Sequence, residues 1–243
     1  MHHLVVDQWS RRPGWLQARD PRAKLVVLLA YLVCVSTLRE LTLLAVAALA
    51  TPLAAGLILG RLPLTGVAAR ATLVLPFAGP VALAAWWSGQ PAEGISLLVR
   101  ACLSAAAVLV VAGATPLPVL LRGLERLGAP SFLVLVVHFL HRYLFVLSEQ
   151  AQHMRLAALS RGAGHGRARR RRGLWRAAGG ALAVLFARSH ARAVAVHRAM
   201  LARGYLGVIP SLSDLKMGAA DWLLAVAGVS SIAAIRTALA FGG

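Results

Sequence analysis

The chain carries several apolar runs that are long enough, or nearly long enough, to cross a lipid bilayer as helices. The clearest of them are Leu25–Leu38, Leu41–Leu59, Ala71–Trp87, Ile95–Ala114 and Trp222–Ile235. A helix needs about 20 residues to cross the hydrocarbon core, so the first and last runs are marginal. With 59% hydrophobic residues and a mean hydropathy of +0.72, the sequence is more apolar than that of an ordinary water-soluble domain. We therefore predict an all-α integral membrane bundle of about five transmembrane helices.

Two local features are predicted within these runs. Pro76, Gly79 and Pro80 favour a kinked or irregular helix over Ala71–Trp87, because proline lacks the N–H that a helix interior uses. After the fourth run, Leu117–Leu127 has the pattern of a short amphipathic helix.

Two further runs, Phe132–Leu147 and Leu174–Ala187, are apolar but are predicted not to cross the membrane. The formal net charge of the chain is +18, and the stretch from Arg155 to Arg203 is dense in arginine and contains no acidic residue. If the basic N-terminus is cytoplasmic, four spans return the chain to the cytoplasm near Thr115. A fifth crossing at Phe132–Leu147 would then place the arginines outside, against the positive-inside rule.

This topology divides the chain into three parts. Residues 1–115 hold the first four spans behind a cytoplasmic N-terminus. Residues 116–213 form a cytoplasmic helical module, and residues 214–243 form the last span.

Within the module, two predicted helices share one pattern and end on the same dipeptide. Each carries small and apolar residues at 3-4 spacing, which is typical of a helix-packing seam. The seam residues are Leu144, Leu147, Ala151, Met154 and Ala158 in the first helix, and Phe186, Ser189, Ala193, Val196 and Met200 in the second. A shift of 42 residues superimposes Arg161 on Arg203 and Gly162 on Gly204. The small residues at mid-seam predict that the two helices cross closely there.

Each Arg-Gly pair has an ordinary and a functional interpretation. Glycine often ends a helix in a left-handed conformation, and a cation near a helix C-terminus is favoured by the helix dipole. Because both arginines follow their seams in the same phase, we expect them also to dock on carboxylates of another protein.

Three stretches are similar to a known family: "DPRAKLVVLLAYLV" at 20–33, "HRYLFVLSEQAQHMRLAALSRG" at 141–162 and "HRAMLARGY" at 197–205. They resemble the transmembrane (T) component of energy-coupling factor (ECF) transporters, most closely its cobalt-type branch, CbiQ. The resemblance implies an L-shaped, non-catalytic subunit in a bacterial inner membrane, with two long crossed coupling helices on the cytoplasmic side. The family's short X-Arg-X motifs map onto Ser160-Arg161-Gly162 and Ala202-Arg203-Gly204, and the first has serine where alanine is commonest.

The resemblance also implies the partners. The chain would link two ABC ATPase subunits, which are CbiO-like and bind ATP, to a CbiM-like membrane subunit, with or without a small CbiN-like one. The transported cobalt or nickel, feeding cobalamin biosynthesis in the cobalt case, would bind the CbiM-like subunit. This chain would contact membrane lipid, and it would bind no cofactor and no nucleic acid.

The residues offer little support for a metal site. His138, His141, Glu149 and His153 lie on one predicted helix, but His138 and Glu149 are separated by about 16 Å along it, too far to share an ion. His2 and His3, beside the N-terminal amine, could bind a metal in square-planar geometry but are more typical of a terminal tail.

An alternative function is a basic membrane-anchored protein that binds anionic lipid or nucleic acid through Arg167–Arg172. An intramembrane enzyme is disfavoured, because the eight acidic residues are scattered and form no paired site.

Overall fold

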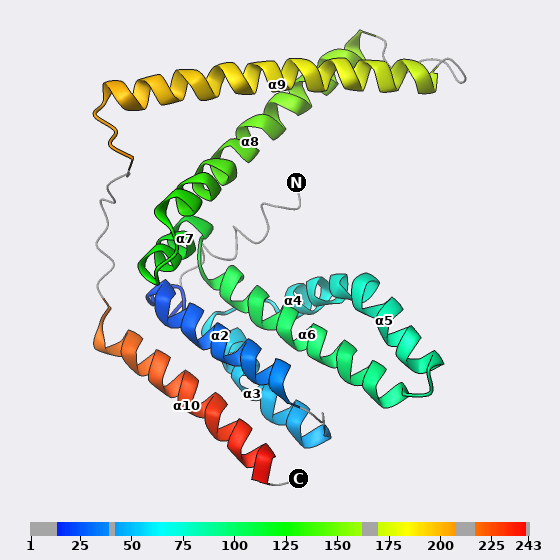
Figure 1. The fold of residues 1–243 in the computed structure, drawn as a ribbon, viewed down its shortest axis with the longest axis vertical. Helices are drawn as coiled ribbons and strands as arrows, with labels where there is room; N and C mark the ends of the chain where they lie inside the picture. Colours follow the sequence, from blue (N-terminus) through cyan, green and yellow to red (C-terminus); the bar gives the residue numbers. More distant parts are fainter. Residues whose placement is uncertain (1–13, 39–41, 162–169, 208–216, 242–243) are drawn as a thin grey trace. The chain divides into compact units, whose positions relative to one another are not determined.

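The computed structural model describes residues 14–38, 42–161, 170–207 and 217–241, and these residues form helices joined by turns (Figure 1). The all-α fold class is therefore confirmed for the described part of the chain. Two compact units are present: residues 1–129 with 215–243, and residues 130–214. The helices of the first unit are α2 (Pro21–Thr37), α3 (Leu43–Leu59), α4 (Leu64–Ala71), the 3-10 turn η1 (Thr72–Val74), α5 (Leu75–Trp87), α6 (Pro91–Ala114), α7 (Leu117–Arg126) and α10 (Ala219–Phe241).

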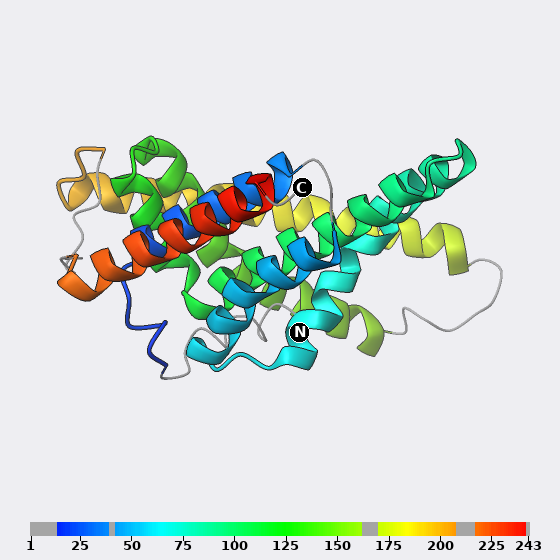
Figure 2. The same cartoon turned by 90° about the horizontal axis from the view of Figure 1, so that it is seen from below.

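Helices α2, α3, α6 and α10 run side by side in the first unit (Figures 1 and 2). Their shared core contains Tyr31, Cys34 and Val35 of α2, Leu49 of α3, Ala107 of α6 and Ile232 of α10. Glycine allows close helix contact here, since a Cβ at Gly228 would lie 2.7 Å from Val27 Cγ2. Helix α10 therefore packs directly against α2, although the two are separated by most of the chain.

The proline-containing run is more regular than predicted. It forms a continuous helical segment over 64–87, in which the irregularity is confined to the 3-10 turn Thr72–Val74. Pro76 lies in the first turn of α5, directly after this 3-10 turn, and Pro80 lies inside α5 without ending the helix. The predicted short amphipathic helix after the fourth run is confirmed as α7, in which Leu121 and Gly123 are buried.

Four described helical segments are long and apolar enough to cross a membrane: Leu64–Trp87, Pro91–Ala114, Ser131–Ser160 and Ala219–Leu239. Three of them contain the predicted spans Ala71–Trp87, Ile95–Ala114 and Trp222–Ile235. Helices α2 and α3 have 17 residues each, about 25 Å of helix, and are shorter than these four. The segment Ser131–Ser160 meets the same length and composition criteria, although the charge pattern predicted that it does not cross.

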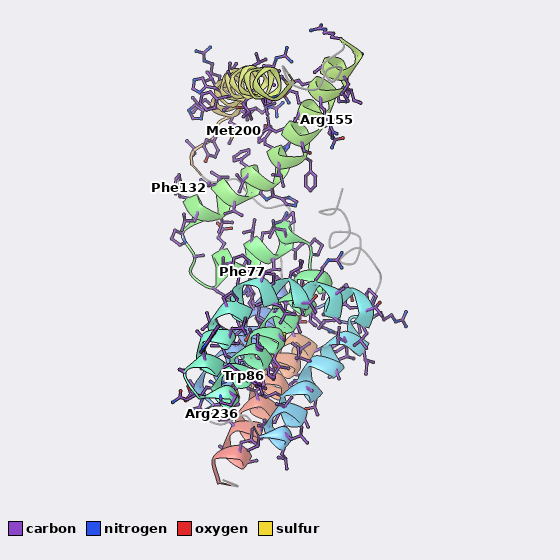
Figure 3. All side chains as sticks on the ribbon, turned by 90° about the vertical axis from the view of Figure 1, so that its right-hand side faces the viewer. Phe77, Trp86, Phe132, Arg155, Met200 and Arg236 are labelled. Atoms are coloured by element: carbon purple, nitrogen blue, oxygen red, sulfur yellow. The ribbon has the colours of Figure 1, made fainter. Side chains whose placement is uncertain are left out.

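Large apolar side chains lie on the outside of the first unit. On α5, Phe77 is 83% exposed and Trp86 is 64% exposed, and both are labelled in Figure 3. Trp87, at the end of the same helix, is 90% exposed. An apolar surface on helices of this length is covered by lipid in a membrane protein, and tryptophan is enriched at the membrane interface.

The second unit consists of two long helices, α8 (Ser131–Ser160) with 30 residues and α9 (Arg170–Ala202) with 33. They contact one another, and they are drawn inclined to each other in Figure 1. Their last residues are 42 positions apart, which equals the shift found between the two sequence patterns.

Candidate functional site

Helix α8 ends at the first predicted motif. Ser160 is its last helical residue, and Arg161 occupies the C-cap position, where its N–H donates to the carbonyl oxygen of Ala157 at 3.2 Å. The Arg161 side chain is exposed. Gly162, the third residue of the motif, lies outside the described residues.

Helix α9 ends at the second motif in a well-defined cap. Gly204 has a φ of +77°, its N–H donates to the Leu201 carbonyl at 3.0 Å, and the Tyr205 N–H donates to the Met200 carbonyl at 3.0 Å. This pair of bonds around a left-handed glycine is the Schellman motif. The prediction that glycine ends the second helix in a left-handed conformation is therefore confirmed at Gly204.

The two arginine side chains are available for an external partner. Arg203 directly follows Ala202, the last residue of α9, and its side chain is exposed like that of Arg161. Within the described part of the chain, neither guanidinium pairs with a carboxylate. Each is held at the negative end of a helix dipole by a fixed backbone.

A hollow of about 280 Å³ marks where α8 and α9 meet. Tyr143 and Leu147 of α8 line it together with Phe186, Ser189 and Ala193 of α9, and His190 and Arg192 complete its wall. Four predicted seam residues are thus brought together: Leu147, Phe186, Ser189 and Ala193.

The remaining seam residues lie elsewhere on the two helices. Met154, Ala158, Val196 and Met200 are half-buried, whereas Leu144 and Ala151 are exposed. The small residues of α9 therefore face Tyr143 and Leu147, one turn nearer the start of α8 than Ala151.

The histidines of α8 do not converge on an ion. His153 Nε2 lies 4.0 Å from Glu149 Oε1 on the exposed side of the helix. His141 instead packs edge-on against Phe145, with ring centroids 5.1 Å apart. In the residues that the structure describes, no group of three or more His, Cys, Asp or Glu side chains is placed to hold a metal. His2 and His3 lie outside those residues, as does the part of the arginine-rich segment from 162 to 169.

One polar cluster was not predicted as a site. Asp20 caps α2 by accepting a hydrogen bond from the Arg22 N–H at 2.9 Å, and its own N–H donates to Asp221 Oδ1 at 3.1 Å. Lys24 Nζ donates to Thr115 Oγ1 at 2.9 Å. Asp20, Lys24, Thr115 and Asp221 are all buried, with at most 7% of their surfaces exposed. The sequence signal for this cluster was the run "DPRAK", which has polar residues directly before the apolar run that begins at Leu25.

Burial lowers the pKa of Lys24 to about 8, and the nearby carboxylates of Asp20 and Asp221 oppose this shift. Lys24 precedes the apolar run that begins at Leu25. The desolvation of the ammonium outweighs the attraction of the two carboxylates.

Several helices of membrane-crossing length, with apolar faces left exposed, define this chain as a multi-pass helical membrane protein. The family model for CbiQ, cobalt transport protein, matches residues 13–213, from before α2 to beyond the end of α9. The chain belongs to this family, and it is the transmembrane component of an ECF transporter, a non-catalytic subunit. No individual curated protein matches the chain.

Proposed function

We propose that this chain couples ATP hydrolysis by two partner ATPases to the movement of a substrate-binding membrane subunit in an ECF-type importer. The observation that carries the proposal is the matched pair of exposed arginines, each one residue beyond a long helix. Membership in a family of cobalt transport proteins supports a place in an ECF transporter complex, whose ATPases are the proposed partners of these two helix ends.

The proposed docking follows from the chemistry of the two helix ends. A guanidinium presents a rigid fork of donors that suits a carboxylate in a protein groove. Arg161 and Arg203 would each enter a groove of one ATPase. The tip of the first helix would consist of Arg161 with Ser160 and Gly162, and the tip of the second would consist of Arg203 with Ala202 and Gly204. Because each arginine is at a helix terminus, a displacement of an ATPase would move a whole helix.

The crossing of α8 and α9 would transmit that displacement. When ATP closes the ATPase dimer, the two tips would move together and the angle between the helices would change. The side chains around the α8–α9 hollow can accommodate such a change, because the hollow has a volume of about 280 Å³ and Phe186 is 72% exposed. The exposed apolar residues of α8, including Phe132 and Leu140, would carry the substrate-binding subunit with it.

The proposed topology places the N-terminus, α8 and α9 in the cytoplasm. By length and composition α8 is able to span a bilayer, but a crossing there would place the arginines that follow it outside the cytoplasm. The positive-inside rule therefore supports the cytoplasmic placement. Cobalt is the proposed substrate, in agreement with the family description, and nickel is the nearest alternative. The metal would bind the partner membrane subunit, and ATP would bind the ATPases.

Uptake by the complete complex tests this function. Liposomes containing the complex should accumulate radioactive cobalt when supplied with ATP, and nickel should compete if it is also a substrate. With Arg161→Glu and Arg203→Glu together, uptake should fall to the level without ATP. Full uptake by the double variant would show that the two arginines do not couple the ATPases to transport.

A further inference from the structure

A cavity of about 380 Å³ lies inside the first unit, between α2, α3, α6 and α10. On α2 its wall is formed by Lys24, Val27, Leu28 and Tyr31, which share one helical face. From Lys24 to Tyr31 the cavity follows about two helical turns, or about 10 Å. The wall that α2 contributes therefore extends over these two turns.

The wall of this cavity is almost entirely apolar. The Tyr31 hydroxyl donates to the Leu49 carbonyl at 3.1 Å, and the Ser231 hydroxyl donates to the Gly228 carbonyl at 2.8 Å, so both hydroxyl protons are already used. Apart from Lys24 and the indole of Trp15, the other lining residues are aliphatic or glycine. An occupant of this part of the cavity must be apolar, because a polar one would lose its hydrogen bonds to water.

The exception to this apolar wall is Lys24, which lies at the end of the cavity near the start of α2. Its side chain is buried, and its ammonium carries three donors, of which one is used by Thr115. No carboxylate of a described residue lies within 4.0 Å of it. The carboxylates of Asp20 and Asp221 are nearby, but Arg19 and Arg22 lie beside them, so the three cations of this cluster outnumber its two carboxylates. A buried ammonium whose remaining donors have no carboxylate within reach is stabilised by an anionic group beside it.

We propose that this cavity binds one anionic glycerophospholipid, with an acyl chain along α2 and the head-group phosphate beside Lys24. Lys24 lies at one end of the α2 wall and apolar residues form the rest of it, which matches a phosphate joined to an acyl chain. Exposed apolar side chains such as Leu223 and Val226 of α10 place this region among lipid tails, so a lipid can enter from the side. A zwitterionic lipid carries its own cation and gains less from Lys24.

Native mass spectrometry of the full chain tests the proposal. The protein is equilibrated with phosphatidylglycerol or phosphatidylcholine in detergent, and the lipids retained after detergent exchange are counted. Lys24→Met removes the charge at similar volume, and Ala55→Leu fills the cavity wall on α3. Ala54→Leu is the matched control, because Ala54 is the adjacent residue of the same helix and does not line the cavity.

The wild-type chain and Ala54→Leu should each retain one phosphatidylglycerol, at least tenfold more often than phosphatidylcholine. Lys24→Met should lose this preference, and Ala55→Leu should lose retention of both lipids at least tenfold. Equal retention of the two lipids by the wild type would mean annular lipid only and would overturn the proposal. Retention of phosphatidylglycerol by Ala55→Leu at the wild-type level would also overturn it, whether or not Lys24→Met folds.

Discussion

Lys24 and Thr115 are 91 residues apart in the sequence, and the ammonium of one donates a 2.9 Å hydrogen bond to the hydroxyl of the other. The bond joins the first turn of α2 to the C-cap of α6. Beside it, Asp221 near the start of α10 accepts from the Asp20 N–H, 201 residues away. Three distant segments of the first unit are thus fixed at one buried polar point.

Removing the Thr115 hydroxyl should destabilise the first unit. In Thr115→Val, the buried ammonium of Lys24 loses its hydrogen-bond acceptor, so the free energy of unfolding should fall by about 1–3 kcal/mol. Thermal unfolding in detergent measures the change. Thr115→Ser keeps the hydroxyl and should remain close to the wild type, so equal stability of the valine and serine variants would show that the bond contributes nothing.

The stability that Lys24 contributes should depend on pH. Its pKa is lowered from 10.5 to about 8 in the folded chain, so between these values the unfolded chain binds more protons than the folded one. The free energy of unfolding of the wild type, relative to Lys24→Met, should therefore rise with pH across this window.

Unfolding of both proteins at about pH 7, 8.5 and 10 measures this difference, since each unit of pKa shift corresponds to about 1.4 kcal/mol. Below about pH 8 Lys24 is protonated in both states, and the difference should be constant. A difference that falls as the pH rises from 8 to 10 would contradict the assignment of the shift to burial.

A glycine inside α9 and the glycine that caps this helix should respond in opposite ways to the same substitution. Gly204→Ala places a Cβ at a φ of +77° and should weaken the α9 cap by about 1–2 kcal/mol. Gly179→Ala lies within the helix, has open space around its Cβ position and should stabilise α9 by about 0.5–1 kcal/mol. Hydrogen exchange of the amides near each site measures both effects. Unchanged exchange in Gly204→Ala would contradict the role of Gly204 in the cap, and faster exchange in Gly179→Ala would contradict the expected gain in helix stability.

Local sequence patterns predicted the features of the chain that depend on local physics. The 3-4 spacing and the repeated Arg-Gly located the ends of α8 and α9, and glycine chemistry predicted the cap at Gly204. The amphipathic pattern located α7. Each of these depends on residues within a few turns of one helix.

The missed features depend on contacts between distant segments. No local pattern pairs Lys24 with Thr115 or Asp20 with Asp221. The extension of the third run back to Leu64 was also missed, because the polar residues Thr65 and Arg70 interrupt its hydropathy without ending the helix. The register of α8 against α9 was also missed, since the small residues of α9 lie beside Tyr143 and Leu147, one turn before Ala151.

The central claim is that Arg161 and Arg203 dock on ATPase subunits, and copurification tests it most directly. The chain is coexpressed with its cognate ATPases, and their yield on the tagged chain is compared between two double variants. Arg161→Glu with Arg203→Glu should reduce the bound ATPase at least tenfold. Arg155→Glu with Arg198→Glu makes the same charge change at exposed positions on the same helices and should bind ATPase like the wild type. Undiminished ATPase binding by the first pair, or equal loss with both pairs, would contradict the account.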